Sequence, residues 1–97
     1  MIHINELLWD EWNVAHIARH GVTPQEVEEV CRSGGVALQG SKGRLVFIGL
    51  TNDGRLLAVV LGVESQAGEG VYYPVTARPA ARKERQLYRK FVQGGKL

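Results

Sequence analysis

The chain has 97 residues, of which 44% are hydrophobic and 23% are charged. This length suits one small domain, and the composition is that of folded proteins rather than of disordered ones. The longest apolar run, residues 56–63, is far shorter than the roughly 20 residues of a membrane-spanning helix, and no signal-like segment opens the chain. We therefore expect a single domain over residues 1–97, located in the cytoplasm and without membrane contacts.

The net charge of +2 is small, but it is unevenly distributed along the chain. Residues 1–77 hold five Lys/Arg and nine Asp/Glu, a balance of −4, whereas residues 78–97 hold seven Lys/Arg and one Asp/Glu, a balance of +6. Such a basic segment predicts an anionic partner, either a nucleic acid or an acidic protein surface.

A first short helix is predicted over residues 11–20. Asp10 can cap its N-terminus, and Gly21 can supply the positive φ angle that closes many helices. The side chains expected to face inward are Val14, Ile17 and Ala18, with Trp12 beside them and both tryptophans, Trp9 and Trp12, in the core.

A second helix is predicted to start at Pro24. Thr23 and Glu26 have the spacing of a capping box, and proline fits the first helical position because its missing N–H costs nothing there. The helix should end at Arg32 before a glycine-rich turn. The residues expected to face inward are Val27, Val30 and Cys31.

The middle of the chain is predicted to form strands, because it is rich in β-branched residues and broken by glycine-containing turns. Asp53-Gly54 is a hairpin turn signal, and the apolar run that follows it is typical of a central strand covered on both faces. Pro74 lacks a donor, which indicates an edge strand or a bulge. The expected strands are residues 36–39, 44–50, 55–63 and 71–77, after an extended lead-in over residues 2–8.

A third helix is predicted over residues 80–92, with Leu87 and Phe91 on its docking face. The fold class expected from these elements is α+β: two N-terminal helices packed on an antiparallel sheet of about four strands, with a C-terminal helix. The arginines of the last helix form a separate stripe at helical spacing. They are Arg82, Arg85 and Arg89.

The chemistry-bearing residues fit neither a nucleotide loop nor a metal cluster. Arg78 directly follows a predicted strand and Arg82 lies one helical turn further on, so both could converge on one phosphate group. The alternative is a solvated basic face that pairs with the acidic first two helices. His20 is either a proton donor or acceptor, or an exposed residue at a helix C-terminus. His16 carries the same two alternatives.

Three segments together resemble the BrnT family of type II toxins, which is similar in fold to RelE-like ribonucleases. They are Trp9-Asp10, Arg19-His20-Gly21-Val22-Thr23 followed by Glu26, and Ala77-Arg78-Pro79-Ala80-Ala81-Arg82-Lys83-Glu84-Arg85 with Tyr88. The resemblance implies metal-independent cleavage of RNA without a cofactor, inhibition of translation, and neutralisation by a small DNA-binding antitoxin. It also implies a toxin homodimer within a toxin–antitoxin heterotetramer.

The resemblance also implies roles for particular residues. The catalytic residues would be His20, as general base or acid, with Arg78 and Arg82 stabilising charge on the phosphate. The RNA-binding residues would be Arg19, Lys83, Arg85 and Arg89, and the auxiliary residues His16 and Tyr88. Two first-helix positions differ from the family, because Trp12 stands in place of a lysine and His16 in place of an asparagine. A non-catalytic basic module that holds RNA or an acidic protein is the alternative function.

Overall fold

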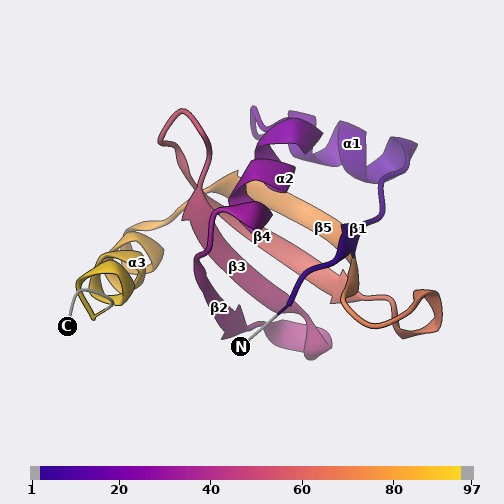
Figure 1. Ribbon diagram of the computed structural model, residues 1–97. Coiled ribbons are helices and arrows are strands. Elements are labelled where there is room, and N and C mark those ends of the chain that lie inside the picture. The colour runs from indigo at the N-terminus through magenta and orange to yellow at the C-terminus, as the bar shows by residue number, and fades with distance from the viewer. Residues whose placement is uncertain (1–2, 95–97) are drawn as a thin grey trace.

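The computed structural model describes residues 3–94, the side chain of Ser65 excepted. It has three helices and five strands, joined in part by two short 3-10 turns (Figure 1). In chain order they are β1 (Glu6–Leu7), α1 (Glu11–Ala18), α2 (Pro24–Arg32), β2 (Val36–Gln39), η1 (Ser41–Gly43), β3 (Leu45–Leu50), β4 (Leu56–Val63), η2 (Ser65–Ala67), β5 (Val71–Pro79) and α3 (Arg82–Gly94).

The strands form one mixed sheet in the order β1-β5-β4-β3-β2. The predicted α+β class, with helices on a sheet, is confirmed, but the predicted antiparallel sheet of about four strands is wrong. The fifth strand is β1, which has two residues and pairs parallel to β5 through Glu6 and Val71. Such a short strand has no periodicity of its own, because its pairing depends on a segment far along the chain.

The neighbours of β5 explain the place of Pro74. This strand lies between β1 and β4, so it is not at the edge of the sheet. The register with β4 shifts between Val60 and Leu61, where Val60 pairs with Thr76 and Leu61 with Pro74. The bulge alternative is therefore correct, since the irregularity accommodates a residue without an N–H.

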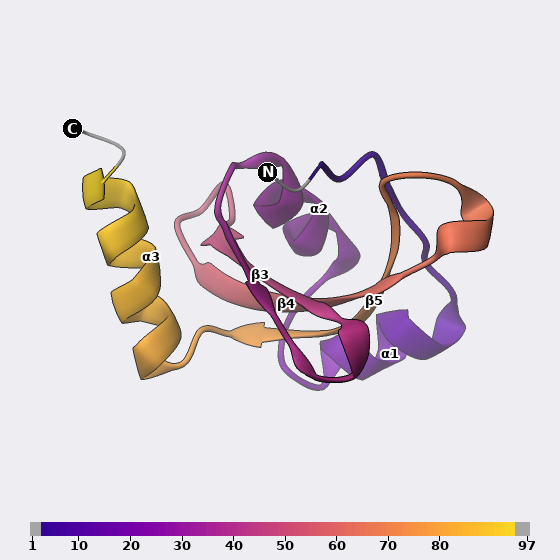
Figure 2. The same cartoon turned by 90° about the horizontal axis from the view of Figure 1, so that it is seen from below.

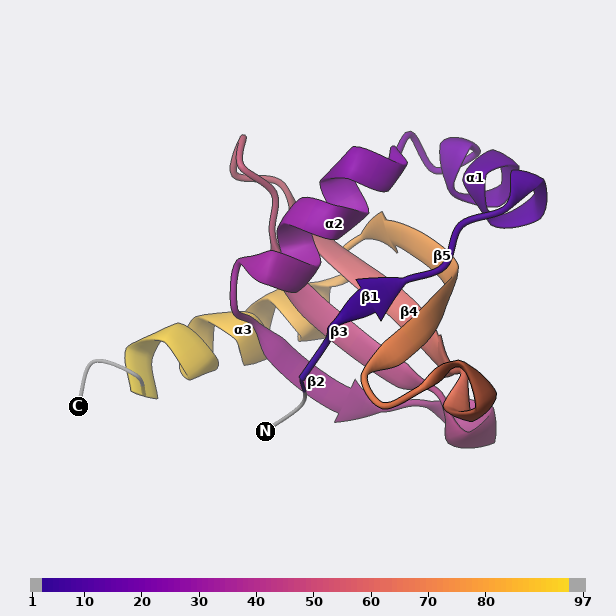
Figure 3. The same ribbon diagram turned by 45° about the vertical axis from the view of Figure 1, so that its right-hand side comes forward.

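The hydrophobic core lies between α2 and one face of the sheet (Figure 3). Leu57, Val59 and Leu61 of β4 are fully buried on this face, while Ala58 on the other face is also fully buried, which confirms the central strand. Gly49 permits the close approach of α2, because a Cβ there would lie 3.2 Å from the Val30 side chain. The buried hydrophobic residues of this cluster are Leu7, Ile17, Val22, Val27, Val30, Phe47, Leu57, Val59, Leu61 and Ala77.

Helix α1 begins at Glu11, as predicted, and Asp10 caps it by accepting a hydrogen bond from the Asn13 N–H at 2.9 Å. The helix ends at Ala18 rather than at His20, and Gly21 follows with φ of 71°. Asn13 and Ile17 are the two residues of this helix that are fully buried. Asn13 takes the inward place because its amide donates to the carbonyl oxygens of Leu8 and Pro74 at 3.0 and 3.1 Å.

The predicted inward face of α1 is largely wrong as a result. Ile17 is buried, but Val14 and Ala18 are exposed. Trp12, predicted to be a core residue, is 57% exposed, whereas Trp9 is half-buried against the core. The Asn13 amide occupies the inward position near the start of α1, and as a result Val14 and Ala18 of the predicted apolar stripe face outward.

Helix α3 projects from one end of the sheet and lies against β2 and β3 (Figure 2). Its half-buried residues are Glu84, Leu87 and Tyr88, whereas Phe91 is 46% exposed, so the predicted docking by Leu87 is confirmed and that by Phe91 is incomplete. None of its residues is fully buried. Among residues 3–94, no helix is both long and apolar enough to cross a membrane.

Candidate functional site

A cavity of about 670 Å³ lies between α3 and the turn that joins β3 to β4. Three arginines and a tyrosine contribute to its wall, so the cavity combines positive charge with an aromatic ring. Its lining residues are Gly54, Arg55, Leu56, Pro79, Arg85, Tyr88, Arg89, Val92 and Gln93. We call this the basic cleft.

Helix α3 supplies most of the charge of the basic cleft. Arg85, Tyr88 and Arg89 lie within one helical turn of each other; the two arginines were predicted to bind RNA and Tyr88 to be an auxiliary residue. The Arg85 Nε donates to the Ala80 carbonyl at 3.3 Å. No ion pair among the described residues involves Arg85 or Arg89, so both guanidinium groups keep donors for an anion.

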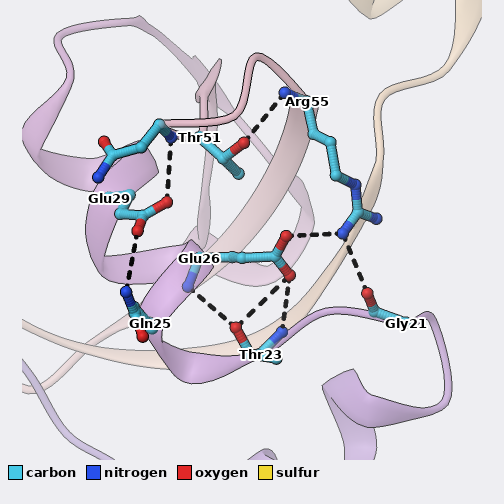
Figure 4. A network of polar contacts seen from close by, with 8 residues as sticks. Gly21, Thr23, Gln25, Glu26, Glu29, Thr51 and Arg55 are labelled. Carbon is cyan, nitrogen blue, oxygen red and sulfur yellow. Dashed lines mark hydrogen bonds and ion pairs between the residues drawn. The ribbon is translucent and has the colours of Figure 1, made fainter.

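Arg55, which sequence reasoning did not select, connects the basic cleft to the turn that follows His20. Its Nη1 donates to the Glu26 carboxylate at 2.7 Å and to the Gly21 carbonyl at 3.1 Å (Figure 4). Its backbone N–H also donates to the Thr51 hydroxyl at 3.0 Å. Arg55 therefore holds the α1–α2 turn next to the wall of the cleft.

The acidic residues of α2 bind partners that do not belong to α3. Glu26 binds Arg55 and completes the predicted capping box with Thr23, while a Glu29 oxygen accepts from the Asn52 N–H at 3.0 Å (Figure 4). Glu28 accepts from the Trp9 indole at 2.9 Å. No ion pair within residues 3–94 joins α3 to α1 or α2, so pairing between these helices does not neutralise the basic face.

Arg78 is held by Glu84 of the following helix. The Arg78 Nη1 and Nη2 donate to the two carboxylate oxygens at 2.7 and 2.9 Å, a bidentate arrangement. These hydrogen bonds raise the pKa of Arg78 and lower the pKa of Glu84. Glu84 also accepts from the Ala81 N–H at 2.7 Å, so it still caps α3 although Ala81 has no capping side chain.

The other predicted catalytic arginine, Arg82, is exposed on the first turn of α3, as is Lys83 beside it. Neither residue lines the basic cleft, and neither does Arg78. Convergence of Arg78 and Arg82 on one phosphate group therefore stays a prediction. It requires that Arg78 either leave Glu84 or divide its hydrogen-bond donors between Glu84 and the phosphate.

The predicted residues of the first helix lie together at its C-terminal end. Arg19 and His20 are exposed, and His16 is half-buried. The His16 and His20 rings meet edge to face with centroids 5.9 Å apart, and His16 stacks on Trp12 at 4.8 Å and an interplanar angle of 8°. No hydrogen bond or ion pair among the described residues joins His20 to Arg78 or Arg82.

Cys31 lies outside this site. Burial raises the pKa of its thiol to about 12, and a second groove is lined by Cys31, Phe47 and Phe91 among others. In the part of the chain from residue 3 to residue 94, no group of three or more His, Cys, Asp or Glu residues is arranged to hold a metal ion.

Comparison of this chain with family models, with curated proteins and with solved structures yields no match.

Proposed function

We propose that this protein is a toxin-like ribonuclease that binds RNA in the basic cleft and cleaves it without a metal ion. The observation that carries the proposal is the gathering of Arg85, Arg89 and Tyr88 around one cavity, which Arg55, paired with Glu26, links to the turn after His20. Arginine forks suit phosphate groups, and a tyrosine ring suits an unpaired base.

The chemistry assigned to this site is transesterification within the RNA strand. His20 takes the proton of a ribose 2′-hydroxyl, the 2′-oxygen attacks the neighbouring phosphorus, and the bond from phosphorus to the 5′-oxygen breaks. The leaving 5′-oxygen takes a proton from solvent water, and His20 returns its proton to solvent. The products are a 2′,3′-cyclic phosphate and a 5′-hydroxyl. Arg78 and Arg82 stabilise the charge of the transition state, while Arg19 and Lys83 contact flanking phosphates together with Arg85 and Arg89.

The wider proposal follows the resemblance described above. The fold is a variant of the RelE/BrnT type, and the protein inhibits translation in the cytoplasm until a small DNA-binding antitoxin neutralises it. Two toxin copies take part in a toxin–antitoxin heterotetramer. The order of elements, with two helices before the antiparallel strands and a basic helix after them, supports this assignment.

The Arg78–Glu84 pair favours a second function, that of a basic module that binds RNA or an acidic protein without cleaving it. A guanidinium whose two terminal nitrogens are occupied by a carboxylate at 2.7 and 2.9 Å has fewer donors for a transition state. In such a module the exposed arginines of the cleft would contribute affinity, and His20 would have no chemical role.

A cleavage assay with purified protein, single-stranded RNA and a metal chelator distinguishes the two functions. A ribonuclease produces cyclic-phosphate ends, and His20→Gln lowers the cleavage rate by about 10²- to 10⁴-fold. His3→Gln is the matched control, since His3 is exposed and lies outside the site. Salt-dependent binding without cleavage would establish the module, and an absence of both would overturn the proposal.

A further inference from the structure

The exposed side of α1 carries a continuous stripe of aromatic and basic side chains. Trp12, His16, Arg19 and His20 follow one another at intervals of four, three and one residues, which places them along one side of the helix. The Trp12 and His16 rings are parallel, and His20 extends the row edge to face. Asn13 and Ile17, on the adjacent side, anchor the helix to the rest of the fold.

Trp12 is exposed to solvent, which is unusual for a tryptophan. It is 57% exposed, as much as any large hydrophobic residue in the described chain, and its ring partner there is the imidazole of His16. One face of the Trp12 ring is stacked on His16, and the ring is not part of the hydrophobic core cluster, so its opposite face offers an open π surface. Nucleobases stack on such surfaces irrespective of their sequence.

The stripe continues toward the basic cleft. Gly21 follows His20 directly, and its carbonyl accepts from Arg55, which lines the cleft. Figure 3 shows the C-terminal end of α1, the start of α2 and the tip of β5 at the same end of the molecule. Trp12 and His20 are eight positions apart, in the last two turns of α1 and the turn that follows it, and a helical rise over eight residues is about 12 Å, the length of a short run of stacked bases.

The charges along the stripe favour a nucleic acid over an apolar protein surface. Arg19 is an exposed cation between the two histidines in sequence, and no ion pair within the described residues involves it. The acidic side chains of this helix lie beyond Trp12, at Asp10 and Glu11, and Asp10 accepts hydrogen bonds from Tyr73. A strand that follows the stripe therefore meets the positive charge of Arg19 before Trp12 and the negative charges of Asp10 and Glu11 after it.

We propose that Trp12, supported by the stacked His16 ring, and His20 form a stacking platform for unpaired bases of an RNA strand whose phosphates occupy the basic cleft. This inference rests on the proposed function, because it takes the RNA of the cleft as given. It adds where the unpaired bases of that single strand lie, since paired bases are not free to stack on a protein ring. The base next to the cleft lies on His20, and the last base of the run lies on Trp12.

The test compares two probes that share phosphates but differ in bases. One is a short 2′-O-methylated oligoadenylate, which lacks the hydroxyl that cleavage needs, and the other is an abasic strand of the same length. We expect Trp12→Ala to weaken binding of oligoadenylate by about 5- to 100-fold and to leave binding of the abasic strand unchanged. Trp12→Phe should retain most of the affinity. Val63→Ala is the matched control, since Val63 is also 57% exposed.

The outcomes distinguish this inference from the proposed function. If Trp12→Ala leaves oligoadenylate binding unchanged, or weakens both probes equally, there is no stacking platform. A loss of self-association in Trp12→Ala, with unchanged RNA affinity, would assign the stripe to a protein contact instead. An Arg85→Gln, Arg89→Gln double variant that binds both probes as well as wild type would instead refute the proposed function itself.

Discussion

The carboxylate of Glu84 binds both terminal nitrogens of Arg78, at 2.7 and 2.9 Å. The Arg78 side chain remains 38% exposed and that of Glu84 16% exposed, so this ion pair is partly shielded from water. It joins the end of β5 to the first turn of α3. The same carboxylate caps the helix at Ala81, so one residue both positions α3 and controls how many donors Arg78 can offer.

Removing the charge of Glu84 should release Arg78. We expect Glu84→Gln to lower the free energy of unfolding by about 1 kcal/mol, because a partly exposed ion pair and part of a helix cap are weakened. The affinity for single-stranded RNA should rise by about 3- to 10-fold, since one more cation becomes available for phosphate. Urea denaturation and fluorescence anisotropy measure the two effects.

Glu69→Gln is the control for this substitution, because Glu69 is exposed in the β4–β5 loop, lies outside the cleft and the α1 stripe, and gives the same change in net charge. If both variants gain RNA affinity equally, the effect is one of net charge and the release of Arg78 is refuted.

The Arg78–Glu84 ion pair should make the free energy of unfolding depend on pH. The hydrogen bonds from Arg78 lower the pKa of Glu84 from its ordinary value of 4.5. A carboxyl with a lowered pKa in the folded state contributes stability that is complete above the unfolded value and is lost as the pH falls through the folded value. Urea midpoints of wild type should therefore fall below about pH 4.5 more steeply than those of Glu84→Gln. Parallel curves would contradict this assignment.

Asn13 should be among the most sensitive positions outside the hydrophobic core. The Asn13 side chain is fully buried. Asn13→Ala removes its hydrogen bonds to the Leu8 and Pro74 carbonyls and the acceptor for the Asp10 N–H. We expect a loss of about 2–4 kcal/mol in urea denaturation. Val14→Ala, on the exposed side of the same helix, should cost less than about 1 kcal/mol. Equal losses would refute the anchoring role of Asn13.

The features that could be predicted from the sequence are those encoded within a few residues. The capping box of α2 depends on Thr23 and Glu26, three positions apart, and both of its hydrogen bonds are present at 3.1 and 3.2 Å. The cationic residues of α3 were found by helical periodicity in the same way, and Arg85 and Arg89 do lie at one cavity.

The features that were missed depend on contacts between distant segments. Arg55 carries no local motif, and its place in the site comes from Glu26, 29 residues earlier in the chain. Trp12 is exposed because Asn13 reaches Pro74, 61 residues away, and so determines which side of α1 faces inward. Arg78 was predicted to bind phosphate, which stays a prediction, and its pairing with Glu84 was missed because that pairing follows from how β5 turns into α3.

Cys31 should react slowly in the folded protein. Burial is the main cause that raises the pKa of its thiol to about 12, so almost none of it is thiolate at pH 8. We expect labelling by a thiol reagent at pH 8 to be slower by at least about 100-fold in the native protein than in urea. Native labelling at the rate of the unfolded chain would contradict the burial of this side chain.

The salt dependence of RNA affinity tests the central claim, binding at the basic cleft, most directly. For single-stranded RNA, each phosphate contact contributes about 0.7 to the slope of log affinity against log salt concentration. The Arg85→Gln, Arg89→Gln double variant loses two such contacts and should therefore reduce the magnitude of this slope by about 1.4. An Arg32→Gln, Lys42→Gln double variant has the same charge change at exposed positions away from the cleft and should leave the slope unchanged. Equal slopes for both double variants would contradict an RNA site in the basic cleft.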